Sequence, residues 1–168
     1  MEAFNHIYHL YKNLVFNLAL QYTNNVQDAE EILQDVYMKV YDHLDDFRYD
    51  VNIKTWIYRI TINQSLDFIK AQQRKKRSIF ANLIRLSAHD ETIQISVFNH
   101  VGIDLENKEA LEQLMRKVYR LPENQKTVII LLKIEDLSQK EVAEIMQISE
   151  GAIESLLQRA KTNLKKML

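Results

Sequence analysis

Apolar residues recur every three to four positions through the first 77 residues, which is the spacing of amphipathic helices. This spacing predicts a first helix from Phe4 to Tyr22 and a second helix that starts after Asn25 and ends at about Leu44. Asn25 is a residue type that caps helix N-termini, and Asp28 suits the positive end of the helix dipole. The predicted buried stripe of the second helix comprises Ala29, Leu33, Val36 and Val40.

A polar loop from Asp45 to Asn52 precedes a third predicted helix, which ends in the basic run from Arg74 to Arg77. Its apolar positions are Trp56, Ile57, Ile60, Ile62 and Leu66. Trp56 shares a helical stripe with Ile60, so we expect Trp56, like Phe47, to pack in a core rather than to stack on a base. Residues 78 to 107 have little helical periodicity and predict a linker with short elements at most.

The region from about Glu109 onward predicts four packed helices. Pro122 stands where the first turn of a helix tolerates proline. The apolar run from Val128 to Leu132 contains enough β-branched residues for a strand, but no partner strand is predicted. The run also follows the polar segment 121–125 closely, which favours a buried helix.

The chain ends in two predicted helices joined by a tight corner. Ser138 and Glu141 form a capping box for the first, and Ser149 can cap the second, which runs from Gly151 to Leu168. The apolar stripe of the second helix comprises Ile153, Leu156, Leu157, Ala160 and Leu164. Its polar face comprises Gly151, Ser155, Gln158, Arg159, Thr162, Lys165 and Lys166. The pattern predicts a helix-turn-helix that enters a major groove, and the alternative is a solvated helix at the end of a bundle.

Composition narrows the fold class and the setting. Two glycines and one proline in 168 residues are too few for the turns of a sheet protein, so we predict an all-α fold of two small helical lobes. The absence of cysteine excludes disulfides and thiolate metal sites and fits the cytoplasm. The longest apolar run is far short of the ~20 residues that span a bilayer, and Glu2 stands where a signal peptide would be basic. We therefore expect no membrane insertion.

Charge is distributed unevenly along the chain. Residues 1–70 contain 6 Lys or Arg and 10 Asp or Glu, residues 71–108 contain 6 and 4, and residues 109–168 contain 10 and 9. The net charge of −1 therefore conceals an acidic N-terminal part and local basic surfaces. This distribution indicates one surface for a protein partner and others for phosphates.

Four segments in this order resemble the extracytoplasmic-function group of bacterial RNA polymerase sigma factors. They are Asp28 to Tyr37, Thr55 to Asn63, Leu121 to Gln125, and Ser155 to Ala160 within the helix-turn-helix. The resemblance implies a region-2-like domain over residues 1–77, a linker over 78–108 and a region-4-like helix-turn-helix domain over 109–168. It implies a protein that directs RNA polymerase to promoters with −10 and −35 elements and initiates transcription.

The resemblance also implies the partners and the residues that contact them. The clamp coiled coil of the largest subunit of core RNA polymerase would contact Glu31, Gln34, Asp35, Met38 and Lys39. The separated strand of the −10 element would contact Asp50, Asn52, Arg59, Asn63, Asp67, Lys70 and Arg74. The −35 element of promoter DNA would contact Ser155, Gln158, Arg159, Thr162 and Lys165. An anti-sigma factor is a further implied partner.

Several residues depart from the pattern of the group. Glu154 and Leu156 stand where the group often has basic residues, and Gln147 replaces the usual glycine of the turn. A glutamate can accept a hydrogen bond from cytosine N4, yet it is repelled by phosphates. At position 70 the group frequently has an arginine, and this chain has Lys70 instead. The lysine keeps the positive charge but lacks the planar guanidinium.

Two other function classes remain open, and an enzyme is not expected. A two-lobed helix-turn-helix regulator that binds duplex DNA as a dimer without polymerase, and a purely protein-binding adaptor, are the two alternatives. Neither needs a strand-capture segment such as residues 55–63. The sequence contains no glycine-rich phosphate loop and no nucleophile with a matching base, so we expect no enzyme and no cofactor. His6 and His9 lack a third ligand, so we expect no metal site.

Overall fold

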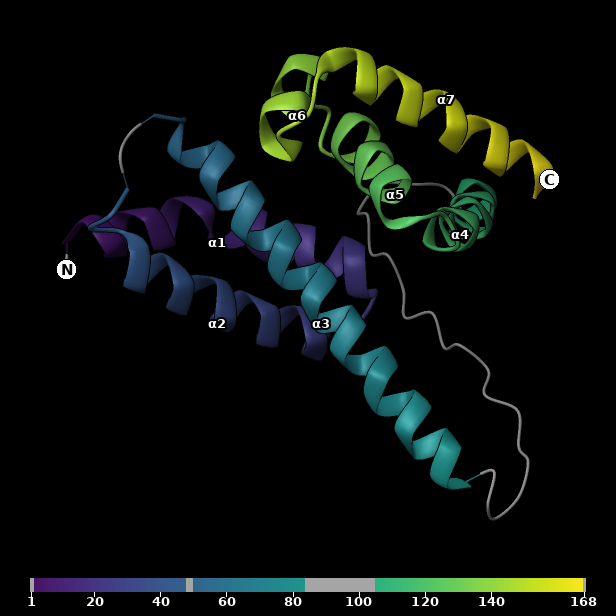
Figure 1. Cartoon of the computed structure of the whole chain (residues 1–168), viewed down its shortest axis with the longest axis horizontal. Coiled ribbons are helices and arrows are strands. Elements are labelled where there is room, and N and C mark those ends of the chain that lie inside the picture. Colours follow the sequence, from purple (N-terminus) through teal and green to yellow (C-terminus); the bar gives the residue numbers. More distant parts are fainter. Residues whose placement is uncertain (1, 48–49, 84–104, 168) are drawn as a thin grey trace. The chain divides into compact units, whose positions relative to one another are not determined.

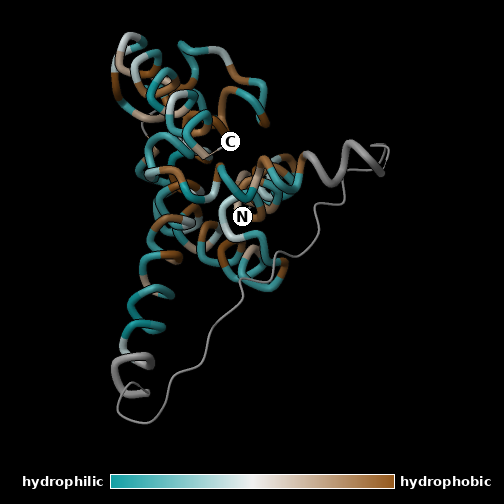
Figure 2. Tube along the Cα trace, turned by 90° about the vertical axis from the view of Figure 1, so that its right-hand side faces the viewer, coloured by the Kyte–Doolittle hydropathy of each residue, from teal (hydrophilic) through white to brown (hydrophobic). Residues whose placement is uncertain are grey.

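The computed structural model describes residues 2–47, 50–83 and 105–167, and every regular element among them is a helix. Figure 1 shows these helices in chain order. Hydrophobic and hydrophilic positions alternate along them (Figure 2), as expected for helices that each bury one side. The all-α prediction is confirmed. The described helices fall into two compact units, of which the first contains α1, α2 and most of α3, and the second contains the start of α3 and α4 to α7.

The first unit is built on a hairpin of α1 (Glu2–Thr23) and α2 (Val26–His43). Asn25 caps α2, because its side-chain oxygen accepts the N–H of Asp28 at 3.0 Å, as predicted. The fully buried side chains of the hairpin are Val15, Leu18, Ala19, Ala29, Ile32, Val36 and Val40. One predicted position is wrong: Leu33 is only partly buried, and Ile32 takes its place in the core.

Helix α3 (Ile53–Leu83) is longer than predicted. We expected it to end in the basic run from Arg74 to Arg77, but it continues for six further residues. The physical reason is local: residues 70–83 contain no glycine or proline, and Lys, Arg and Gln are strong helix formers. The four basic side chains therefore lie along a helix rather than at its end, and all four are exposed. Of the rest of the predicted linker, residues 84–104 lie outside the described residues, whereas residues 105–108 are helical and begin α4 (Leu105–Tyr119), so the predicted end of the linker was wrong by four residues.

The second unit contains α4 (Leu105–Tyr119), α5 (Glu123–Ile129), α6 (Gln139–Met146) and α7 (Glu150–Lys166). A core cluster of Met115, Val118, Leu121 and Ala160 joins α4 to α7. The run from Val128 to Leu132 is helical and largely buried, as predicted. Pro122 is the N-cap of α5 rather than a residue of its first turn, so its predicted position was wrong by one residue.

The helix that begins as α5 widens into a π-helix over Ile130–Ile134. The N–H of Glu135 bonds to the carbonyl of Ile130 at 3.0 Å, five residues back instead of four. Asp136 then adopts a left-handed conformation with φ of 52°, which ends the helix before α6. This change of helix type has no counterpart in the apolar pattern of the sequence.

Local hydrogen bonds define the helix-turn-helix formed by α6 and α7. The capping box is present: Ser138 Oγ accepts from the N–H of Glu141 at 3.2 Å, and the Glu141 carboxylate accepts from the N–H of Ser138 at 2.8 Å. Gln147 ends α6 in a left-handed conformation with φ of 57°, although it is not a glycine. The N–H of Ile148 returns to the carbonyl of Ala143, which completes a Schellman turn.

Ser149 caps α7 by accepting the N–H of Ala152 at 3.2 Å, as predicted. Residues 147 to 149 thus form the turn from which α7 starts. The apolar stripe of α7 is confirmed in part, because Ile153, Leu157 and Ala160 are buried whereas Leu156 and Leu164 are only partly buried.

We expect Ser138→Ala to lower the free energy of unfolding by about 1 kcal/mol, the usual cost of losing an N-cap. Hydrogen bonds from the backbone and side chain of Ser138 hold the pKa of Glu141 below its ordinary value. A lowered folded-state pKa stabilises the protein at neutral pH, and this contribution is lost as the pH falls through that pKa. In Ser138→Ala the Glu141 pKa should rise, as an NMR titration of its carboxyl carbon would show. Ser149→Ala is the matched control, which removes a cap but should leave the Glu141 pKa unchanged.

Candidate functional site

The outer face of α2 carries the residues assigned to polymerase binding. Glu31, Gln34, Met38 and Lys39 are exposed, and Met38 is 66% exposed, which is high for an apolar side chain. Asp35 differs from the expectation that all five point outward. It is partly buried, and its carboxylate accepts a 2.7 Å hydrogen bond from the Gln64 side chain of α3. Asp35 is therefore oriented by the first unit itself.

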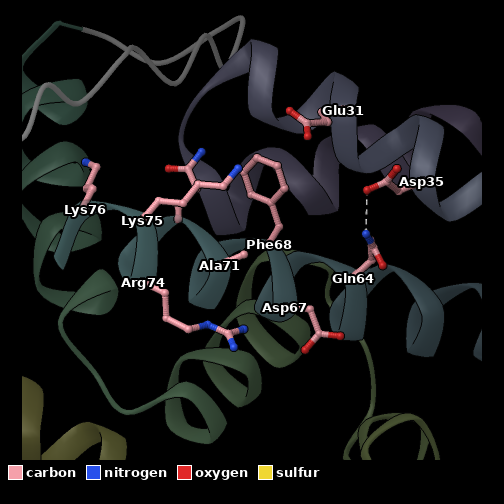
Figure 3. Close-up of a pocket in the computed structure, with 10 residues that line it drawn as sticks. Glu31, Asp35, Gln64, Asp67, Phe68, Ala71, Arg74, Lys75 and Lys76 are labelled. Carbon is pink, nitrogen blue, oxygen red and sulfur yellow. Dashed lines mark hydrogen bonds between the residues drawn. The ribbon is translucent and has the colours of Figure 1, made fainter. Parts of the chain in front are cut away.

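A groove of about 570 Å³ lies between α2 and α3, as Figure 3 shows. Glu31 and Asp35 line it from α2, and Asp67 adds a third carboxylate from α3. The other residues that line it are Gln64, Phe68, Ala71, Gln72, Arg74, Lys75 and Lys76. The groove is thus acidic toward α2 and basic along the later part of α3. The sequence pattern missed Gln64 and Phe68, because nothing local indicates which residues of α3 face α2.

A second groove, of about 550 Å³, adjoins the other side of the α2 face. Its aromatic lining comes from α1 and α2 and comprises Phe4, Tyr8, Tyr37 and Tyr41. Phe4 packs edge-on against Tyr41 at a centroid distance of 5.5 Å, and Tyr8 against Tyr37 at 4.8 Å. Burial raises the pKa of Tyr37 well above its ordinary value, so its hydroxyl stays protonated and donates to the carbonyl of Tyr8 at 3.4 Å. No local pattern in the sequence indicates this cluster.

The residues assigned to the −10 element lie on α3 and just before it. Their spacing of three or four residues places Arg59, Asn63, Asp67, Lys70 and Arg74 on one side of the helix. Arg59 is partly buried and the other four are exposed. Arg74 already donates through Nε to the carbonyl of Lys70 at 3.3 Å, so only the outer end of its guanidinium is directed outward.

The loop before α3 contributes Asp50 and Asn52, which are both exposed. Asn52 also caps α3, because its side-chain oxygen accepts a hydrogen bond from the N–H of Lys54 at 2.9 Å. This capping role was not predicted from the sequence. The amide nitrogen of Asn52 is the part left to donate to a base. Trp56 and Phe47 are only partly buried and are not among the buried core residues, so the prediction that they pack in a core is confirmed only in part. Residues 48 and 49 of the loop lie outside the described part of the chain.

The residues assigned to the −35 element lie along the outer face of α7. Ser155, Gln158, Arg159, Thr162 and Lys165 are all exposed. Two hydroxyls are committed within the helix, because Ser155 Oγ donates to the carbonyl of Gly151 at 2.9 Å and Thr162 Oγ1 to that of Gln158 at 2.9 Å. The opposite side of α7 is fixed to α5 by a 2.9 Å hydrogen bond from Asn163 to Gln125.

Among the residues that the structure describes, no three His, Asp or Glu side chains are grouped as metal ligands. In the same residues, no helix combines the length and the apolar character needed to cross a bilayer.

Two family models match two separate segments of the chain. Sigma-70 region 2 matches residues 7–75, and Sigma-70, region 4 matches residues 111–164. The region 2 match includes α2 and the polar face of α3, and the region 4 match includes the whole helix-turn-helix. A regulator that binds only duplex DNA, or a helical adaptor, would not account for the region 2 match.

Curated relatives align over almost the whole chain. The ECF RNA polymerase sigma factor SigW of Bacillus subtilis is 29% identical, over 99% of this chain and 89% of its own length. SigM of the same organism is 28% identical over 95% of this chain and 91% of its own length. The ECF RNA polymerase sigma-E factor of Escherichia coli is 28% identical over 95% and 83%, respectively.

Solved structures share the fold. The sigma factor RpoE of Bartonella quintana, in complex with the anti-sigma factor NepR, has a TM-score of 0.69 at 22% identity and covers 99% of this chain and 96% of its own. CnrH, in complex with the cytosolic domain of CnrY, has a TM-score of 0.65 at 20% identity and covers 99% and 87%. The family matches, the full-length relatives and the shared fold agree: this chain belongs to the extracytoplasmic-function group of RNA polymerase sigma factors, which direct bacterial RNA polymerase to promoters and initiate transcription.

Proposed function

We propose that this sigma factor works through three polar helix faces, each with its own partner. The α2 face binds the clamp coiled coil of the largest polymerase subunit, the α3 face holds the separated strand of the −10 element, and the α7 face reads the −35 element. The observation that carries the proposal is that most residues of each face are exposed, with Asp35 and Arg59 partly buried, while the opposite side of the same helix is buried. The domains would be residues 1–77 and 109–168, with 78–108 as the linker.

The α2 face suits a protein partner better than nucleic acid. Glu31 and Asp35 would repel phosphates, whereas exposed Met38 and the neighbouring aromatic groove offer apolar surface to a helix. A coiled coil presents helices with charged flanks and fits such a surface. Asp35 is held by Gln64, so its carboxylate is already oriented before the partner arrives.

The α3 face suits a single strand better than a duplex. Asn63 and Asp67 can hydrogen-bond to the edge of an unpaired base, and Lys70 and Arg74 can follow the phosphates. The loop at Asp50 and Asn52 stands at the start of the same helix and would receive a base removed from the stack. The mixture of acceptors, amides and cations is poor for a uniform phosphate backbone, which would favour cations alone.

Two further parts of the proposal rest on the family. An anti-sigma factor would regulate this chain, as NepR is the anti-sigma factor in the complex with RpoE of Bartonella quintana. The protein would act in the cytoplasm, where its polymerase partner works, and would have no enzymatic activity of its own.

We expect Gln34→Ala combined with Met38→Ala to weaken binding to core polymerase by about tenfold or more, because both side chains are exposed at the centre of the proposed interface. Fluorescence anisotropy of the labelled full chain, titrated with core polymerase, measures the affinity. Gln113→Ala with Leu114→Ala is the matched control, since it removes an exposed glutamine and a 46% exposed apolar side chain from α4. Equal affinity of the two double variants would refute the α2 assignment.

Asn63→Ala should reduce open-complex formation on a duplex promoter, and a template already melted across the −10 element should restore much of it. The reason is that unpairing costs a few kcal/mol, which the protein no longer has to supply on the second template. Permanganate reactivity of unpaired thymines reports melting on both templates. Asn17→Ala is the control, because Asn17 is an exposed amide of α1, outside the proposed strand-binding face of α3. Normal melting of duplex DNA by Asn63→Ala would remove Asn63 from the strand-binding face.

A further inference from the structure

The outer face of α7 is divided into two chemically different halves. Its first two turns present hydrogen-bond acceptors, since Glu150, Glu154 and Ser155 are all exposed there. The basic residues of the helix begin only at Arg159 and continue to its C-terminus. In a helix-turn-helix the N-terminal part of the recognition helix contacts base edges. The acceptors therefore occupy the part of α7 that meets bases.

Ser155 behaves as an acceptor because of its own hydrogen bond. Its single O–H is donated to the carbonyl of Gly151 at 2.9 Å, so the oxygen offers only lone pairs to the outside. A free serine hydroxyl could either donate or accept. Ser155 in this orientation favours a base that carries an amino group.

Glu154 lies beside Ser155 and can only accept when it is ionised. The residues three and four positions away on the helix are Glu150, Gly151, Leu157 and Gln158, so no cation of α7 is placed to pair with its carboxylate. Gly151 stands between Glu150 and Glu154, and a Cβ at this position would have no contact within 4 Å, so the position of Gly151 itself is open. The carboxylate is thus exposed, unneutralised by its own helix and directed away from the core.

We propose that Glu154 is a specificity-determining residue that selects a cytosine within the −35 element by accepting a hydrogen bond from its N4 amino group. The proposal rests on the assignment of α7 to the −35 element. In the major groove the donors are the amino groups of cytosine and adenine, and carboxylates pair with cytosine N4. Guanine presents O6 and N7, both acceptors, so the same carboxylate rejects it. Repulsion from phosphates keeps Glu154 at the base edges rather than at the backbone.

The test uses full-length protein with core polymerase and a promoter library that is randomised across the −35 element. The bound fraction is sequenced, and affinities are then measured on single promoters. Wild type should prefer cytosine at one position by about tenfold, the discrimination expected of a good base contact. Glu154→Gln keeps the size of the side chain and pairs well with adenine N6 and N7, so the preference should move from cytosine to adenine at that position alone.

Glu144→Gln is the matched control, because Glu144 is an exposed glutamate of α6 and its replacement removes the same charge from the helix-turn-helix. It should leave the base preference unchanged. Both variants should have the same thermal unfolding temperature as wild type, since both side chains are exposed.

Three results would count against the proposal. A wild-type preference that Glu154→Gln leaves unchanged would overturn it while keeping the −35 assignment of α7. Equal tightening of all promoters by Glu154→Gln would also overturn it, because Glu154 would then act only by repulsion. Absence of any enriched base across the element, with initiation intact, would refute the −35 assignment itself.

Discussion

Each proposed functional surface of this sigma factor depends on the fact that a helix can bury only one of its sides. The stripe of Ile32, Val36 and Val40 fixes the rotation of α2, and this rotation alone places Gln34 and Met38 outside. The same holds for α7, where burial of Ile153, Leu157 and Ala160 turns Ser155 and Arg159 outward. A core substitution that rotates either helix would therefore move the interface as well.

The sequence predicted the elements whose signals are local. The caps at Asn25, Ser138 and Ser149 were found because each lies within three residues of the N–H that it accepts. The exposure of the α7 face followed from its apolar stripe. What the sequence missed depends on contacts between helices: the Gln64 to Asp35 hydrogen bond joins residues 29 positions apart, and no periodicity within either helix indicates it.

Two errors in the core and helix bounds have similar physical reasons. Leu33 and Ile32 are adjacent apolar residues, so the stripe of α2 could be drawn through either, and only packing against α1 decides for Ile32. The end of α3 was expected at the basic run because helical periodicity is weak from residue 78 onward. Residues 78–83 nevertheless contain no glycine or proline, so nothing local ends the helix after its strong helix formers Lys, Arg and Gln.

The charge of the chain bears on how it finds promoters. With a net charge of −1 and an acidic first part, the free protein has no strong long-range attraction for DNA, whose binding is dominated by phosphate neutralisation. Its exposed lysines and arginines are nearly balanced by exposed aspartates and glutamates, and on α7 the acidic first turns weaken the attraction of the later basic residues for phosphates. The affinity for promoter DNA must therefore come largely from simultaneous contacts made in the polymerase complex, where binding at one element raises the effective concentration at the other. If the individual surfaces are this weak, we expect this sigma factor to act on promoters only as part of the holoenzyme.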